Sequence, residues 1–208
     1  MNYFRYISVI LVFMLLAIGS GSDSGENTSS YMDSADSTQK DFFEIVTKFD
    51  SIFESRAEGN NIQFQQICES KDDALREYFN RDDIKNFKVE NWYGEVQEVQ
   101  SIYGGGGLKV LCNSEGSHYT YKGTNFYLNT TNDYEDVLLS YTAIKKSSDL
   151  YQKLSTLKKE SIIKFSGKFI KSPRAYRRTY ILSNSEYANA DQEYVFQFTD
   201  VAELKSAN

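Results

Sequence analysis

The sequence predicts a β-rich α+β fold, in which an N-terminal α-helical segment precedes an OB-like five-stranded β-barrel. Apolar residues recur at helical spacing in residues 38–82 and alternate from residue 89 onward. The first alternating segment is long and contains an internal glycine, as expected for a strand that bends through both layers of a small barrel. A short helix is predicted between the third and fourth strands, which is the order of elements in OB folds.

The N-terminus has the features of an export signal. Residues 7–19 are an apolar run of 13 residues, interrupted only by Ser8, that follows the single charge of Arg5. A membrane-spanning helix needs about 20 residues, whereas the apolar core of a signal peptide has about 7–15. We therefore expect residues 1–19 to be a signal peptide, with an uncleaved N-terminal anchor as the alternative. Both interpretations export the remainder, to the periplasm or to the outer face of the inner membrane.

A polar stretch separates this signal from the first helix. Residues 20–37 are rich in Ser, Gly, Asp and Asn with almost nothing to bury, which predicts a disordered spacer that ends near Ser37. The helical segment 38–82 follows and is expected to pack on the barrel. In its first helix Ser37 is the expected N-cap, and the Glu-Gly-Asn-Asn run at 58–61 is the expected stop.

The second helix is predicted from Ile62 to Phe79, with a weaker apolar pattern. Ser70 and Asp73 have the spacing of a capping box, so two short helices with a break near residue 70 are the alternative. Cys68 in this segment and Cys112 in the second strand are the two cysteines of the chain. In an oxidising compartment such a pair is a disulfide candidate, and two buried thiols are the alternative.

The rest of the chain alternates between apolar and polar residues. The predicted strands are residues 89–103, 108–113, 118–128, 161–170 and 192–201. Gly94 inside the first strand predicts a bulge or bend, and the glycine run 104–107 predicts a hairpin turn between antiparallel strands. A helix over 149–157 is expected to be capped by Ser148. Residues 134–147 fit either a strand or a short helix.

Three quoted segments carry a family resemblance: "NWYGEVQEV", "LYQKLSTLKKESIIKFSGKF" and "EYVFQFTDV". They resemble a group of uncharacterised bacterial exported, periplasmic proteins with an OB-like fold, over roughly residues 85–201. The shared motifs are structural, so the resemblance implies a barrel domain over 85–203 and an envelope location, and no activity. Glu160 and Ser161 stand where the pattern tends to have Gly-Asp, so the chain deviates from the pattern at that turn.

The sequence offers little for catalysis. His118 is the single histidine and lies at a predicted strand edge. The pairs Asp72–Asp73 and Asp82–Asp83 are expected in helix starts or turns, where carboxylates favour exposed amides. A Cys pair 44 residues apart with one histidine makes a poor zinc site. We therefore predict no catalytic residue, metal site or cofactor, with a metal-dependent hydrolase or nuclease as the alternative.

The clearest functional pattern is a basic region in an acidic protein of net charge −6. Residues 145–178 contain eleven Lys or Arg and only two acidic residues. The predicted ligand-binding residues are Lys164, Lys168, Lys171, Arg174, Tyr176, Arg177 and Arg178, on one strand face and in the loop 171–191. They predict a non-enzymatic binding or adaptor module for an acidic protein, glycan or lipid head group, with nucleic acid disfavoured by the net charge. A structural protein, whose basic face docks on its own acidic helices, is the further alternative.

Overall fold

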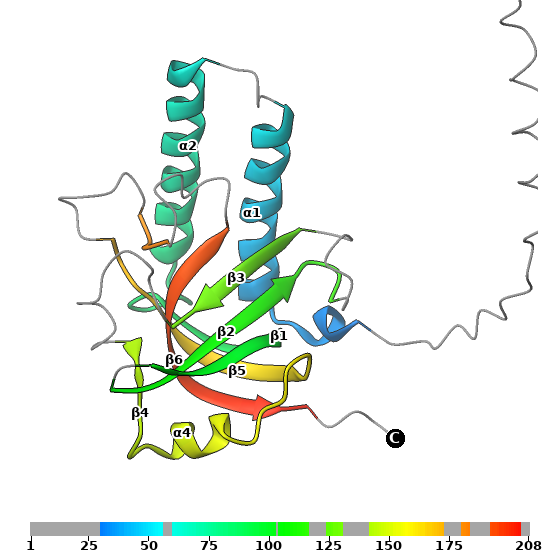
Figure 1. Cartoon of the computed structure of the whole chain (residues 1–208). Helices are drawn as coiled ribbons and strands as arrows, with labels where there is room; N and C mark the ends of the chain where they lie inside the picture. The colour runs from blue at the N-terminus through cyan, green and yellow to red at the C-terminus, as the bar shows by residue number, and fades with distance from the viewer. Residues whose placement is uncertain are drawn as a thin grey trace, which may run out of the picture.

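The computed structural model (Figure 1) describes residues 30–55, 60–102, 104–116, 124–130, 142–172, 180–183 and 192–204. The expected signal peptide or anchor at 1–19 lies outside the described residues. So do His118 and four of the predicted binding residues, namely Arg174, Tyr176, Arg177 and Arg178. Within the described residues, none of the helices is long and apolar enough to cross a membrane.

The fold is mixed α/β and mostly sheet. Its strands are β1 (Lys88–Ile102), β2 (Gly105–Asn113), β3 (Asn125–Asn129), β4 (Ile144–Lys145), β5 (Ile162–Phe169) and β6 (Glu193–Glu203). Its helices are η1 (Tyr31–Ser34), α1 (Ser37–Ser55), α2 (Asn61–Phe79) and α4 (Asp149–Leu154). The strand order is β1-β5-β6-β3-β2-β4, and β1 also pairs with β2, so five of the six strands form a ring. The pairings in the ring are antiparallel except β3 with β6.

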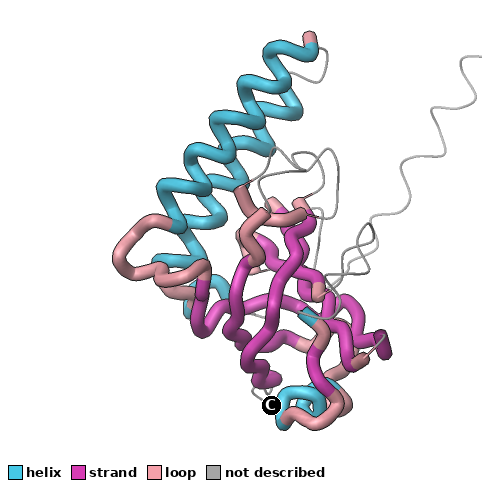
Figure 2. Tube along the Cα trace, turned by 90° about the vertical axis from the view of Figure 1, so that its left-hand side faces the viewer, coloured by secondary structure: helices cyan, strands magenta, loops and turns pink. Residues whose placement is uncertain are grey.

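The helices α1 and α2 form a hairpin that stands on one end of this ring and projects away from it (Figures 1 and 2). The start of α1 and the end of α2 supply the side chains that enter the core. Phe42 is fully buried at the centre. Its ring lies 5.1 Å from the rings of Phe126 and Phe169 and 5.5 Å from that of Trp92, measured between centroids. The amphipathic pattern of residues 38–82 is thus explained by burial of one face against the strands.

The folded chain begins before Ser37. The side chain of Met32 in η1 is 7% exposed, and the Tyr31 hydroxyl accepts a hydrogen bond from the backbone N–H of Asn113. Residues 30–36, which the polar composition assigned to a disordered spacer, therefore pack against the strands. The N-cap of α1 is Asp36 rather than Ser37, because its carboxylate accepts the N–H of Gln39 at 3.0 Å.

The helix α2 is continuous, as predicted for residues 62–79, so the alternative of two short helices with a break near residue 70 is wrong. Asn60 caps it by accepting the N–H groups of Ile62 and Gln63. The Ser70 hydroxyl donates to the backbone carbonyl of Gln66 one turn earlier, which satisfies it inside the helix. Cys68 and Cys112 are both buried thiols that are not bonded to each other, so the structure agrees with the thiol alternative and not with the disulfide candidate.

Three of the four glycines in the run 104–107 belong to a strand, so the run is not simply a turn. Gly105, Gly106 and Gly107 pair with Ile102, Ser101 and Gln100 of β1, and Gly104 alone has a positive φ, of 85°. Side chains are excluded from the strand because β4 and α4 cover it. A Cβ at Gly105 would lie 2.2 Å from the carbonyl oxygen of Ile144, and one at Gly106 3.0–3.1 Å from Leu154 and Tyr151.

Gly94 in β1 also lies where a neighbouring strand leaves no room for a side chain. A Cβ there would lie 2.5 Å from Val110 Cγ1 and 2.8 Å from the carbonyl oxygen of Leu111. The register of β1 shifts on either side of it, between Val89 and Trp92 against β5 and between Val96 and Glu98 against β2. The expected bend is therefore supplied by these two irregularities, and Gly94 permits close packing of β2.

The predictions for the C-terminal half hold well. Burial alternates strictly along β5, with Ile163, Phe165, Gly167 and Phe169 facing the core. Ser148 caps α4 by accepting the N–H of Tyr151, as expected, although α4 ends at Leu154 rather than at 157. Glu160, where the resembled pattern tends to have Gly, has a φ of 69°. That value is in the region that glycine adopts without strain.

Candidate binding surfaces

The outer face of β5 and the start of β1 carry a stripe of lysines. Lys164 and Lys168 lie on the same face of β5, because side chains alternate between the two faces of a strand. Both lysines are half-buried. Lys88 of β1 lies directly opposite Lys168 in the antiparallel pairing, and Tyr93 lies opposite Lys164. Residues directly opposite one another share a face of the sheet. We call Lys88, Lys164 and Lys168 the basic stripe.

The basic stripe has no salt bridge with the carboxylates of the described residues. Asp200 of β6, next to Ser166 in the sheet, pairs instead with Lys153 of α4. Like charges that face each other across strands are destabilising. The stripe is therefore a patch of uncompensated positive charge in an acidic protein. Lys88 was missed at the sequence level, because only the strand register brings it to Lys168.

Lys171, the third predicted residue that the structure describes, has different surroundings. It follows β5 and forms an isolated bridge with Ile181. Its Nζ lies 5.6 Å from the ring centroid of Tyr180 and 5.8 Å from that of Phe87, at cation–π distance. Lys171 thus helps to hold the segment 180–183 against the aromatic residues beside α2.

Tyr180 anchors that segment to α2. Its backbone N–H donates to Asp72 Oδ1 at 3.0 Å, and its ring lies 5.4 Å from the guanidinium of Arg76. Burial raises the pKa of Asp72 to about 6, and the hydrogen bond from Tyr180 opposes that rise. The middle of the predicted loop 171–191 is therefore docked on α2 at Tyr180, as the structural alternative requires.

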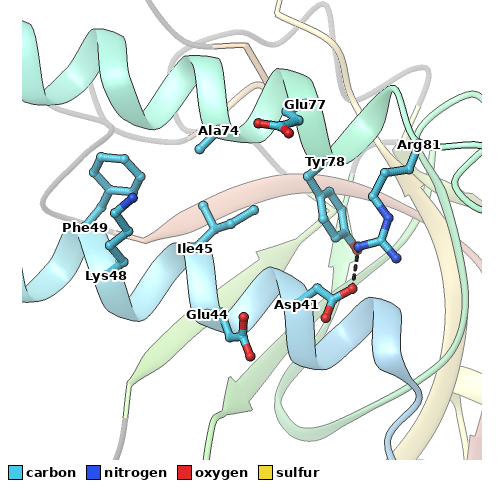
Figure 3. A pocket seen from close by; sticks show the side chains of 9 residues that line it. All are labelled: Asp41, Glu44, Ile45, Lys48, Phe49, Ala74, Glu77, Tyr78 and Arg81. Atoms are coloured by element: carbon cyan, nitrogen blue, oxygen red, sulfur yellow. Dashed lines mark hydrogen bonds and ion pairs between the residues drawn. The ribbon is translucent and has the colours of Figure 1, made fainter.

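A second surface feature is a groove of about 400 Å³ between α1 and α2 (Figure 3). Ile45, Phe49 and Tyr78 give it an apolar floor. Arg81 closes one end, since it pairs with Asp41 of α1 and with Asp83. These two hydrogen bonds raise the pKa of Arg81 further above its already high value.

The rim of the groove carries charges of both signs, since Lys48 of α1 lines it together with two glutamates. Glu44 of α1 and Glu77 of α2 lie on opposite sides of it (Figure 3). Neither has a salt bridge within the part of the chain that the structure describes. The groove therefore differs in charge from the basic stripe, because carboxylates and cations both line it.

The carboxylate pairs singled out from the sequence have structural partners. Asp72 and Asp73 lie within α2 rather than at a helix start, and Asp73 pairs with Arg76 at 2.8 Å. Asp83 is bonded to Arg81, and this bond lowers the pKa of Asp83. In the described ranges no three residues among His, Cys, Asp and Glu are grouped so as to hold a metal ion.

No protein-family model, no curated protein and no solved structure matches this chain.

Proposed function

We propose that this protein is a non-enzymatic binding or adaptor module of the cell envelope, which binds an acidic partner through the basic stripe and the adjoining loop 171–191. The observation that carries the proposal is the direct opposition of Lys88 and Lys168, neither of which forms a salt bridge with a carboxylate of the described residues. An anionic partner would neutralise two charges that repel each other in the unbound protein.

We further propose that the five-stranded ring is an OB-like barrel. In chain order its strands are β1, β2, β3, β5 and β6, and the ring runs β1-β2-β3-β6-β5 before returning to β1. The helix α4 lies between β3 and β5 in sequence. In OB folds the loop between the last two strands commonly borders the ligand, and here that loop is the basic segment 171–191.

The partner is proposed to be an acidic protein, an anionic glycan or a lipid head group. The net charge of −6 opposes long-range attraction of a polyanion, so binding requires local contacts at the stripe. This favours a compact acidic group over a nucleic acid, whose affinity depends on neutralising many phosphates. An envelope location follows from the apolar run 7–19 and the resemblance to exported proteins.

A triple substitution with a charge-matched control tests the proposal. The three stripe lysines changed to Ala should weaken binding to polyglutamate, to polygalacturonate or to phosphatidylglycerol vesicles by at least about tenfold. The control changes the exposed lysines Lys40, Lys85 and Lys146 to Ala, which alters the net charge equally. Equal losses in both variants would indicate unspecific attraction and overturn the proposal. A stripe variant that loses stability without any change in binding would support the structural alternative.

A measurement of turnover distinguishes the enzymatic alternative from the binding module. A hydrolase or nuclease on the same fold predicts product formation that is abolished by a metal chelator or by His118→Ala. A binding module predicts ligand retention without product in either condition.

A further inference from the structure

Lys71 is a buried cation without a hydrogen-bond partner. It lies on α2, its side chain is among the largest that are fully buried, and the residue is 1% exposed. No hydrogen-bonding group of the described chain reaches its Nζ. An isolated ammonium is far more costly to bury than a neutral polar group, and a nearby negative charge would offset that cost.

The groups around Lys71 do not supply that charge well. Asp72 is adjacent in sequence, but its Oδ1 accepts the N–H of Tyr180 rather than a proton from Lys71. Desolvation is the largest influence on the pKa of Asp72 and outweighs the attraction of Lys71, so this carboxylate is itself poorly stabilised in its charged form. The Tyr194 ring centroid lies 5.9 Å from Lys71 Nζ, near the outer limit of a cation–π contact.

Among the described residues, three further buried polar side-chain atoms have no hydrogen-bond partner. They are Tyr194 Oη, Gln192 Oε1 and Ser172 Oγ. Tyr194 is the residue that Lys71 contacts, and Gln192 lies two residues before it, immediately ahead of β6. Ser172 donates its backbone N–H to the carbonyl of Tyr180, the residue bonded to Asp72. Native proteins rarely leave one such atom unsatisfied, and a bound water or ion commonly accounts for it.

We propose that Lys71, Tyr194 and Ser172 form an internal binding site for a small monovalent anion, of chloride or simple carboxylate size. Lys71 supplies the positive charge, and the two hydroxyl groups supply neutral donors. Gln192 Oε1 accepts from a water that accompanies the anion. The burial of Lys71 and Tyr194 excludes a phosphate ester or a sugar, since neither would fit without displacing α2 from β6.

This site is distinct from the basic stripe. Lys71 belongs to the helical hairpin and points into the protein, whereas the stripe lies on the outer face of β1 and β5. An enclosed ion of this kind joins α2 to β6, so its release is expected to weaken the attachment of the hairpin to the ring. The anion therefore acts as a structural ligand, whichever partner binds the outer face.

Chloride NMR linewidth measures the proposed site directly. The full-length protein should broaden the chloride signal, and sodium acetate should remove that broadening by competition. Lys71→Met should abolish the broadening while the protein stays folded, because the substitution removes a buried charge and keeps a similar volume. Tyr194→Phe keeps the ring and should weaken chloride binding severalfold, to about the extent expected for one lost hydrogen bond.

Two control variants show whether the chloride signal reports the internal site. Lys48→Met, an exposed lysine of α1, should leave the broadening unchanged. The Lys88→Met and Lys168→Met double variant removes charge from the basic stripe and should also leave it unchanged. Equal broadening in wild type and Lys71→Met overturns the internal site, as does broadening that disappears only in the stripe variant. If Lys71→Met does not fold, Tyr194→Phe with unchanged chloride affinity overturns the proposal by itself.

Discussion

Lys88 of β1 lies directly opposite Lys168 of β5, so the two lysines share the outer face of the sheet at one register position. Like charges directly opposite one another are destabilising, so a carboxylate or a neutral residue at either position would favour the fold. This opposed pair is the feature on which the proposed acidic ligand rests.

Lys88→Glu should therefore stabilise the unbound protein. Replacing the like-charge pair by an opposite-charge pair is expected to raise the free energy of unfolding by about 0.2–1 kcal/mol at low salt. Urea denaturation at low and high ionic strength measures the difference, which should shrink as salt is added. Lys146→Glu, in an exposed turn, is the control for net charge. A variant no more stable than this control would mean that the two lysines do not repel each other.

The Lys88→Glu variant also tests the proposed binding function. If the stripe binds an acidic ligand, Lys88→Glu should lose affinity while it gains stability. A simultaneous loss of both would instead indicate that Lys88 has a structural role.

Neither cysteine should react in the native protein. Cys112 is completely buried, and burial raises the pKa of its thiol well above the ordinary value, which suppresses the reactive thiolate. Ellman's reagent should therefore find little accessible thiol before unfolding and two thiols per chain in denaturant. Fewer than two thiols in denaturant without reductant would show that Cys68 and Cys112 form the disulfide that an oxidising compartment permits.

The sequence predicted elements where one residue pattern has one structural outcome. The strict alternation from Ile162 to Phe169 has only one face that avoids water, and β5 follows it residue by residue. The glycine run 104–107 joins two antiparallel strands, as predicted, but its last three residues were assigned to the turn because two structures need glycine for different reasons. A turn needs glycine for its backbone freedom. The strand β2 needs glycine at position 105 because the backbone of Ile144 occupies the space that a Cβ would fill. This close approach is a tertiary contact, which the periodicity of the sequence cannot reveal.

The candidate surfaces were predicted only in part for the same reason. Lys164 and Lys168 were identifiable from alternation within a single strand, but Lys88 joins them through a pairing register set by other residues. Lys71 has helical spacing from the apolar residues Leu75, Tyr78 and Cys68, and a lysine in that pattern is usually assigned to the helix surface. Only the packing of α2 on β6 shows that it is buried.

Gly105→Ala should destabilise the protein by about 1–3 kcal/mol, the usual cost of forcing atoms into a packed site. Its Cβ would lie 2.2 Å from the backbone carbonyl oxygen of Ile144, so β4 must move away from β2. Gly107→Ala is the matched control, because its nearest neighbours, at 3.1 and 3.2 Å, are side-chain atoms of Gln100 and Ile102 that can shift. Equal losses in thermal denaturation would contradict the role assigned to β4.

Glu160→Gly should stabilise the turn that precedes β5. A non-glycine residue at a φ of 69° is strained by about 1 kcal/mol, although glycine loses part of this gain through the greater freedom of the unfolded chain. The backbone N–H of Glu160 donates to the carbonyl of Val96 at 2.7 Å, and glycine retains that bond. Lys159→Gly, at the preceding residue, should instead destabilise. If both variants lose stability equally, the turn does not depend on the left-handed conformation.

Asp72→Asn should remove part of the pH dependence of stability. The pKa of Asp72 is about 6 in the folded protein against an ordinary 3.8, so the unfolded chain releases this proton more readily. Stability is then expected to fall as the pH rises from 4 to 6 and to stay lower above that range. The asparagine oxygen still accepts the N–H of Tyr180, so the variant should match wild type near pH 4 and exceed it at pH 7. Asp73→Asn, which leaves Asp72 in place, should retain the fall between pH 4 and 6. Denaturation profiles that are parallel for wild type and Asp72→Asn at every pH would show that the carboxyl titrates equally in both states.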